Sequence, residues 1–205
     1  MKNSNPIFQS IFGMEWSSLP SVMHKHYANR AYSCDVVTVE GIMKVKISTF
    51  ARLLSPILRL TGALVPYDGD NVPVTVHFRS EPDSAAYCFD RIFHFPNREP
   101  YHFRSRMVPV GGAEIIEFMS FGVGWNAHYR YYGNKVLIEH RCYKMKLFGK
   151  LIRIPLELLL GKGYAEEEAI SDKRFRMYMD IQHPLFGRVY TYSGEFAVKE
   201  IAYHA

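Results

Sequence analysis

The sequence predicts a mainly β, α+β domain built on an antiparallel sheet. Over residues 174–182 and 188–198 the side chains alternate in character with a period of two, as in strands whose two faces meet different surroundings. The five residues between them, His183–Gly187, contain a proline that cannot donate to a ladder and a glycine that accepts positive φ. They therefore predict a hairpin loop, and since a lone hairpin is marginal in water, further strands are expected beside it.

Length and composition agree with a single β-rich domain spanning residues 1–205. The chain is 48% hydrophobic and 15% aromatic, with 14 Tyr and 14 Phe, which are residues that favour strands. The formal charge of +5 is spread along the chain and mixed with 20 acids. A solvated basic surface explains this balance better than an anionic partner does, and nucleic-acid binding is not expected.

Three cysteines, Cys34, Cys88 and Cys142, stand far apart and form no metal-ligand spacing. We expect reduced thiols in a cytoplasmic protein, no bound metal and no cofactor. The N-terminal residues lack the apolar core of a signal peptide, which fits the same location.

Two helices are predicted within residues 1–30, over 7–12 and 16–27, with a break near Gly13. We expect them to close one end or side of the sheet. The first strand follows at 34–47, and Gly41 inside it predicts a bulge or a bend.

An apolar helical insertion is predicted at 48–66, where Ser48 caps a helix that Pro56 kinks or splits. Its charges make it unable to span a membrane. We expect it to act as a lid over the sheet; the alternative is that residues 50–65 contact a partner protein or a membrane surface.

The remaining strands follow quickly and fill residues 72–200. They are predicted at 72–79, 85–94, 101–108, 113–118, 123–132, 135–147, 174–182 and 188–198, with a segment at 166–170 that leads into 174–182. A turn is predicted at 68–71 and a short helix at 154–161. The connections are too short for crossover helices, so the order is antiparallel. About ten strands favour a curled sheet or closed barrel of the lipocalin-like or calycin-like kind, and a helix-grip (START-like) fold is the alternative.

Alternation also divides each strand into an apolar face and a face rich in Arg, His, Tyr and acids. In 101–107 the split is Tyr101, Phe103, Ser105 and Met107 against His102, Arg104 and Arg106. Two interpretations remain open: the polar face is wet, as in an ordinary antiparallel sheet, or it lines a lumen that suits an amphipathic or anionic ligand.

Several motifs resemble one bacterial family. They are His183–Gly187 followed by Tyr190, Tyr192 and Gly194–Phe196, together with Asp90–Phe93 and Phe103–Met107. On these motifs the chain resembles the family called domain of unknown function 4166. The resemblance implies an accessory or substrate-handling domain and supplies no catalytic residues.

The most favoured function is binding of a hydrophobic or amphipathic small molecule in a β-barrel cavity. The candidate ligand-binding residues are Arg91, Arg104, Arg130, Arg141, Tyr143, Tyr190 and Tyr192. One alternative is an isomerase-like or cyclase-like enzyme in which a histidine works with an acid, with His128, Glu139 and His183 as candidates. A further alternative is a protein-interaction module.

Overall fold

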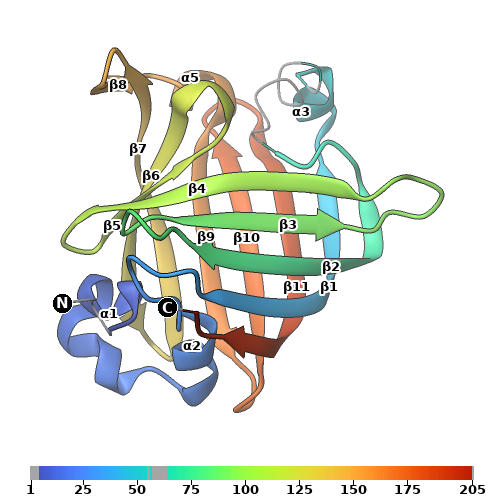
Figure 1. The fold of residues 1–205 in the computed structure, drawn as a ribbon. Coiled ribbons are helices and arrows are strands. Elements are labelled where there is room, and N and C mark those ends of the chain that lie inside the picture. The colour runs from blue at the N-terminus through green and yellow to red at the C-terminus, as the bar shows by residue number, and fades with distance from the viewer. Residues whose placement is uncertain (1–4, 55, 57–63, 205) are drawn as a thin grey trace.

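The structure, a computed structural model, describes residues 5–54, 56 and 64–204 and consists of a closed antiparallel barrel with small helices at its two ends (Figure 1). The strands are β1 Val36–Ile47, β2 Gly69–Ser80, β3 Tyr87–Phe93, β4 Tyr101–Gly111, β5 Glu114–Phe118, β6 Val123–Tyr132, β7 Lys135–Leu147, β8 Lys150–Ile154, β9 Lys162–Ala169, β10 Arg174–His183 and β11 Gly187–Ala202. The helical segments are α1 Ile7–Phe12, η1 Gly13–Ser18, α2 Ser21–His26, α3 Thr49–Leu53, η2 Ser120–Gly122 and α5 Glu157–Leu160.

The sheet closes because β7 pairs with both β6 and β9. The order is β6-β5-β4-β3-β2-β1-β11-β10-β9-β7-β8, and the additional β6–β7 pairing joins its ends. Each neighbouring pair is antiparallel, and β8 extends from β7 outside the ring. The predicted closed barrel of about ten strands is confirmed, and the helix-grip alternative is excluded because the sheet closes on itself.

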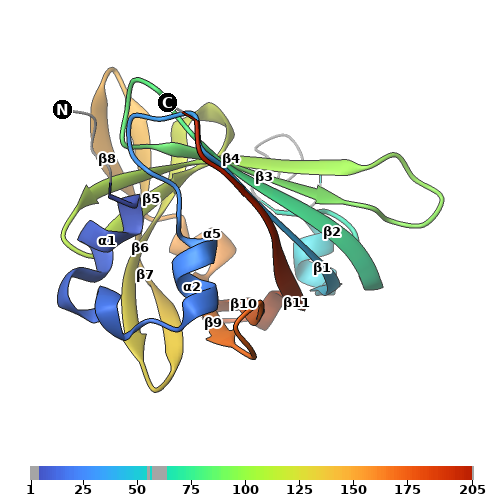
Figure 2. The ribbon, with the colours of Figure 1, turned by 60° about the horizontal axis from the view of Figure 1, so that its bottom comes forward.

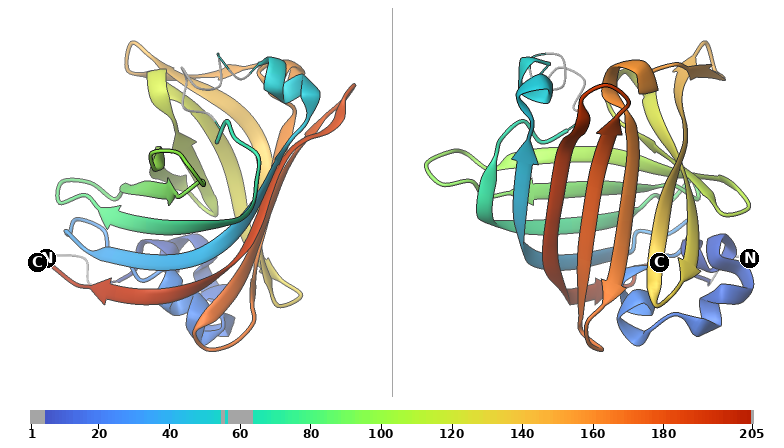
Figure 3. Two further views of the ribbon diagram at one scale, coloured as in Figure 1. Left: turned by 90° about the vertical axis from the view of Figure 1, so that its right-hand side faces the viewer. Right: turned by 180° about the vertical axis from the view of Figure 1, so that it is seen from behind.

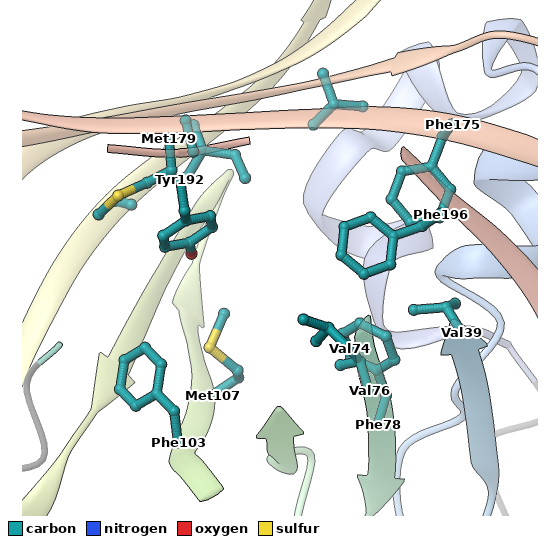
Figure 4. Packing of buried hydrophobic residues seen from close by; sticks show 14 of the residues in the cluster. Val39, Val74, Val76, Phe78, Phe103, Met107, Phe175, Met179, Tyr192 and Phe196 are labelled. Atoms are coloured by element: carbon teal, nitrogen blue, oxygen red, sulfur yellow. The ribbon is translucent and has the colours of Figure 1, made fainter. Parts of the chain in front are cut away.

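The apolar face of each strand points into the barrel. Phe103 and Met107 of β4 are buried, whereas Arg104 and Arg106 between them are exposed. Figure 4 shows side chains of β10 and β11, such as Met179 and Phe196, facing those of β2 and β4 across the interior. Of the two interpretations left open by the alternation, the wet polar face is therefore the correct one.

The helices α1 and α2 cover one end of the barrel (Figure 2). Phe8 of α1 is buried among three tyrosine rings, with centroids 4.2 Å from Tyr27, 5.8 Å from Tyr87 and 5.5 Å from Tyr129. The predicted helix at 16–27 is divided in two, because Leu19 is extended and Pro20 caps α2. The N-terminal segment thus forms the floor of the barrel.

Other element predictions need correction. The predicted turn at 68–71 is largely the start of β2. The register of β1 shifts between Thr38 and Val39 against β11 and between Met43 and Val45 against β2, and not at Gly41. Gly41 instead allows β1 and β11 to approach closely, since a Cβ at this position would lie 2.3 Å from the carbonyl oxygen of Glu195. β1 and β11 curve strongly through this region (Figure 3).

β8 is missing from the sequence-based prediction, and of β9 only the segment 166–170 is recognised. The inner face of β9 carries Gly163, Ala165 and Glu167, which hides the usual apolar alternation. Gly163 lets the ring of Trp125 lie close to β9, since a Cβ there would lie 3.1 Å from that ring. Of the insertion predicted at 48–66, the structure describes α3 with Ser48 as its cap, and residues 55 and 57–63 lie outside the described residues. No helix in the described ranges is long and apolar enough to cross a membrane.

A buried carboxylate, Asp35, joins the N-terminal segment, β1 and the C-terminal residues. Arg30 donates to it from Nε at 2.7 Å and from its backbone nitrogen at 3.1 Å, and the backbone nitrogen of His204 donates at 2.9 Å. Burial raises the pKa of Asp35, but the hydrogen bonds and the charge of Arg30 lower it further, and the net pKa lies below its ordinary value. Asp35 therefore stays ionised in the folded protein near neutral pH.

We predict that Asp35→Asn lowers the free energy of unfolding by about 2 to 4 kcal/mol at neutral pH, because Arg30 loses its buried counter-charge. The folded pKa of Asp35 lies below the unfolded one, so its contribution is complete above the unfolded value and is lost as pH falls through the folded value. Urea unfolding of both proteins at a series of pH values should therefore show a difference that shrinks in acid. The matched control, Asp70→Asn in an exposed pair with Lys44, should leave the unfolding midpoint almost unchanged. A difference that is the same at every pH would contradict the role of the charge.

Candidate functional site

Two adjoining cavities lie inside the described part of the barrel. The lower cavity, of about 60 Å³, reaches the helical floor at Phe8 and Tyr27. The upper cavity, of about 40 Å³, reaches Leu64 and Leu160 at the opposite end. Four residues line both cavities and form the layer between them: Arg91, Glu117, Trp125 and Tyr192. The interior therefore has a polar middle layer between two mainly apolar spaces.

Arg91 is the centre of this layer. It stands on the inward face of β3, and its guanidinium carbon lies 3.9 Å from the ring centroid of Phe89 and 3.7 Å from that of Phe103. The guanidinium donates to Glu117 at 2.6 Å and to Ser105 at 2.7 Å. Stacking between aromatic rings and a charge-assisted bond make a buried arginine tolerable, because a bare charge in this position would be very costly.

Glu117 and Ser105 complete the charge pair. The hydroxyl of Ser105 donates to the same Glu117 oxygen at 2.6 Å, so this Oε1 accepts two hydrogen bonds. Tyr192 lies beside the pair. Burial raises its pKa to about 12, in spite of the opposing effect of Arg91, and its hydroxyl stays neutral. The middle layer thus carries a neutralised ion pair, with no surplus positive charge.

A second acid, Glu167 of β9, lies at the bottom of the lower cavity. Its Oε2 accepts a short hydrogen bond from the hydroxyl of Tyr27, and its Oε1 lies 3.4 Å from Nε2 of His26. Burial raises the pKa of Glu167, but His26 and the hydrogen bonds lower it more, so that the net pKa lies below its ordinary value. The lower cavity therefore contains an ionised carboxylate whose two oxygens already have partners.

Two tyrosine hydroxyls in the lower cavity have no hydrogen-bond partner among the described residues. They belong to Tyr87 of β3 and Tyr129 of β6, whose side chains line the cavity. Burial raises the pKa of each of these two tyrosine side chains well above the ordinary value, so both hydroxyls are neutral and able to donate a hydrogen bond. Buried polar groups are nearly always paired, and unpaired hydroxyls beside free space indicate a partner that comes from outside the chain, either water or a ligand.

The wall of the upper cavity is partly made by the short helix α5. β7 pairs with β9 only over residues 135–139 and with β8 from residue 143, and α5 follows β8. Tyr143 donates to the carbonyl oxygen of Gly161 at 3.1 Å, and Nε2 of His140 lies 3.3 Å from Glu157. These side-chain contacts connect α5 to β7.

His140 is also bonded to the cavity lining. Trp125 donates from Nε1 to Nδ1 of His140 at 3.0 Å, so the proton of the neutral ring belongs on Nε2, facing Glu157. Burial lowers the pKa of His140, which favours this neutral form. The chain Trp125–His140–Glu157 thereby orients the indole that separates the two cavities.

Only some of the predicted ligand-binding residues lie at the cavities. Arg91 and Tyr192 line both cavities, Tyr143 lines the upper one, and Tyr190 is buried against Tyr192 with centroids 5.9 Å apart. The other three candidates belong to the outer face of their strands. Arg104 pairs with Asp90, Arg130 with Glu139 and Arg141 with Glu114, and all three arginines have substantially exposed side chains.

The candidate acid–base residues do not meet in the cavities. His128 faces Glu139 across β6 and β7 on the outer side of the barrel, where Glu139 pairs with Arg130. His183 is buried, but it supports a turn: Nε2 lies 3.0 Å from the carbonyl oxygen of Leu158, and Nδ1 accepts from the nitrogen of Leu185 at 3.1 Å. The structure thus does not bring these three residues together.

The sequence-based candidates did not include Tyr87 and Tyr129, whose side chains line the lower cavity, nor Trp125, Glu117, Glu167, His26 and Tyr27. A usable signal existed for Glu117, which occupies an inward position two residues after Ile115 in a strand that was predicted. Glu167 stands in a run of three glutamates, which resembles a solvated segment. Within the described residues, no group of three His, Cys, Asp or Glu side chains is arranged to hold a metal ion.

Three solved structures show a weak likeness to this chain. Rv2717c from M. tuberculosis is 9% identical, with a TM-score of 0.45 over 80% of this chain and 91% of that one. A mutant of the fluorescent protein UnaG is 15% identical, with a TM-score of 0.33 over 80% of this chain and 95% of that one. The dehydratase domain of the polyketide PpsC from Mycobacterium tuberculosis is 6% identical, with a TM-score of 0.20 over 92% of this chain and 84% of that one. Superpositions this loose do not indicate a ligand or a reaction.

Sequence similarity identifies the family of the chain. No curated protein sequence matches this chain. A family model does match, over residues 19–196, which is nearly the whole barrel and agrees with the resemblance carried by the motifs at 90–93, 103–107 and 183–196. The chain belongs to the family described as "Domain of unknown function (DUF4166)".

Proposed function

We propose that the protein binds a small amphipathic molecule inside the barrel, with a neutral polar group, such as a hydroxyl or a carbonyl, in the lower cavity. The observation that carries this proposal is the pair of unpartnered hydroxyls of Tyr87 and Tyr129 in a cavity otherwise lined mainly by apolar side chains. A concave, mostly apolar space with a few convergent polar groups is the usual form of a small-molecule site.

The charges inside the barrel favour a neutral ligand over an anionic one. Arg91 is already neutralised by Glu117 at 2.6 Å, and Glu167 adds a second carboxylate with a lowered pKa. A carboxylate or phosphate on the ligand would meet these two acids at close range, which is unfavourable in a medium of low dielectric constant.

The size of the cavities favours a small molecule, or one end of a longer one. Free spaces of about 60 and 40 Å³ hold a few water molecules as they stand. Methionines line both spaces, with Met107 and Met177 in the lower cavity and Met179 in the upper one. Because methionine is unbranched and flexible, these walls can move to enlarge the space.

Acid–base catalysis is less well supported. The histidine–acid pair at the lower cavity, His26 and Glu167, has the residue types that an isomerase would use. However, both oxygens of Glu167 are engaged and its pKa is lowered, which makes it a weak base. Binding therefore explains the geometry better than a reaction does.

We predict that octanol binds more tightly than octanoate, by about tenfold or more, because the carboxylate meets the two buried acids. Isothermal titration calorimetry of the whole chain with each compound measures the ratio. Native mass spectrometry of the freshly purified protein, with and without denaturation, adds a test for a ligand carried over from the expression host. Tighter binding of octanoate, or binding of neither compound together with no released mass, would contradict the proposal.

We also predict that the double variant Tyr87→Phe, Tyr129→Phe binds octanol about thirtyfold more weakly, since each lost hydroxyl removes a hydrogen bond of roughly 1 kcal/mol and about 1.4 kcal/mol corresponds to a tenfold change in affinity. The variant should fold, because the described structure gives these hydroxyls no partner to lose. Tyr132→Phe on the exposed face of β6 is the matched control and should bind like the unmodified protein. Equal affinity of the double variant and the control would mean that the hydroxyls do not contact the ligand.

A further inference from the structure

The end of the barrel opposite α1 and α2 displays large apolar side chains at four separate tips. They are Leu53 in α3, Phe148 in the β7–β8 turn, Leu158 in α5 and Leu185 in the β10–β11 turn, and all four are largely exposed. Figures 1 and 3 show α3, α5, β8 and the β10–β11 turn together at this end. We call this surface the apolar rim. Single exposed apolar residues need no explanation, but a group of them at one end of a molecule does.

Phe148 shows that this exposure does not serve the fold. It is 94% exposed and occupies the two-residue turn between Leu147 and Lys150 with φ +48°, followed by Gly149 with φ +76°. Positive φ is uncommon for any residue other than glycine and is particularly unfavourable for a bulky one. The turn thus holds an aromatic ring in water at a cost in backbone energy.

The same region carries an excess of positive charge. Residues 142–163 contain five cations, Lys144, Lys146, Lys150, Arg153 and Lys162, and a single acid, Glu157. In the part of the chain that the structure describes, Lys144, Lys146 and Lys150 have no acidic partner, whereas Arg153 lies 3.8 Å from Glu157.

Two of these cations face each other in the hairpin. Lys144 of β7 is paired in register with Arg153 of β8, so their side chains leave the same face of a two-stranded ribbon. Like charges directly opposite one another destabilise a ladder. An anionic partner outside the protein would remove this repulsion.

We propose that the apolar rim and the basic β7–β8 hairpin dock the protein on the surface of an anionic lipid bilayer. Separate protruding side chains are suited to a fluid interface, which closes around each of them, and lysines with apolar stems reach the headgroups from the same region. A rigid protein partner would need a continuous complementary surface, and a second copy of this chain would bring another set of unpaired lysines against the first.

This orientation places one end of the upper cavity at the membrane. The helix α5 presents Leu158 outward, while Leu160 two residues later lines the upper cavity. An amphipathic molecule dissolved in the bilayer would therefore lie close to α5. The docking proposal does not depend on the proposed ligand and is tested without one.

The experiment is flotation of the full chain with vesicles of phosphatidylcholine alone and of phosphatidylcholine mixed with phosphatidylserine. We expect binding to the mixed vesicles, weakened by added salt. Lys146→Gln with Lys150→Gln should reduce the partition coefficient by about fivefold for each lysine. The matched control, Lys173→Gln with Lys199→Gln near α2 at the other end, should leave it unchanged.

The aromatic tip is tested in the same way. Phe148→Ser should weaken binding to the mixed vesicles severalfold, whereas Met14→Ser, which removes an equally exposed side chain at the helical end, should not. All these positions are exposed, so unchanged thermal unfolding of the variants is expected and confirms that they fold. Equal binding to both kinds of vesicle, or equal effects of the rim and control variants, would overturn the proposal. So would a dimer, seen by size-exclusion chromatography, that Phe148→Ser abolishes.

Discussion

The structure depends on the pairing of β7 with both β6 and β9. β7 pairs with β6 over residues 135–145 and with β9 at residues 135–139, and this converts a row of antiparallel hairpins into a ring. Closure gives each of the ten strands of the ring a neighbour on both sides and so removes most of the free sheet edge. It also divides every strand into an inner and an outer face, which decides whether each side chain meets water or the interior. The upper half of β7 leaves β9 and pairs with β8, and α5 stands beside this gap.

The inner face is mostly apolar, so its few polar groups are informative. Arg91 is compatible with this interior because two phenylalanine rings enclose it and Glu117 and Ser105 bond to it. Replacing such a pair by apolar residues is often neutral or stabilising, so burial of the pair is weak support for a purely structural role. The nearby hydroxyls of Tyr87 and Tyr129 lack partners among the described residues, which is the second sign that this layer is arranged for something other than packing.

The two ends of the barrel differ in chemistry. At one end α1 and α2 fill the opening with buried residues such as Phe8 and Met23, and Asp35 bonds this segment to the C-terminal residues. At the other end, which the upper cavity reaches at Leu160, large apolar side chains are exposed, and the lysines of residues 144–150 have no acidic partner among the described residues. The two ends of the barrel are therefore not equivalent: one is packed, and the other is basic and apolar. The proposed ligand site and the proposed membrane surface are consistent with this asymmetry.

Local patterns in the sequence determined much of the fold. Period-two alternation identified β1 to β7, β10 and β11, the Pro184 and Gly187 turn was recognised from its residue types, and short connections implied antiparallel order. Alternation cannot say which face is enclosed, because both faces of a strand have the same period. Arg104, Arg130 and Arg141 were therefore chosen as ligand residues, although their strands turn them outward. Only closure decided that Arg91, Glu117 and Glu167, which come from three different strands, line one interior: their proximity depends on the register around the ring, and no segment of the sequence contains that information.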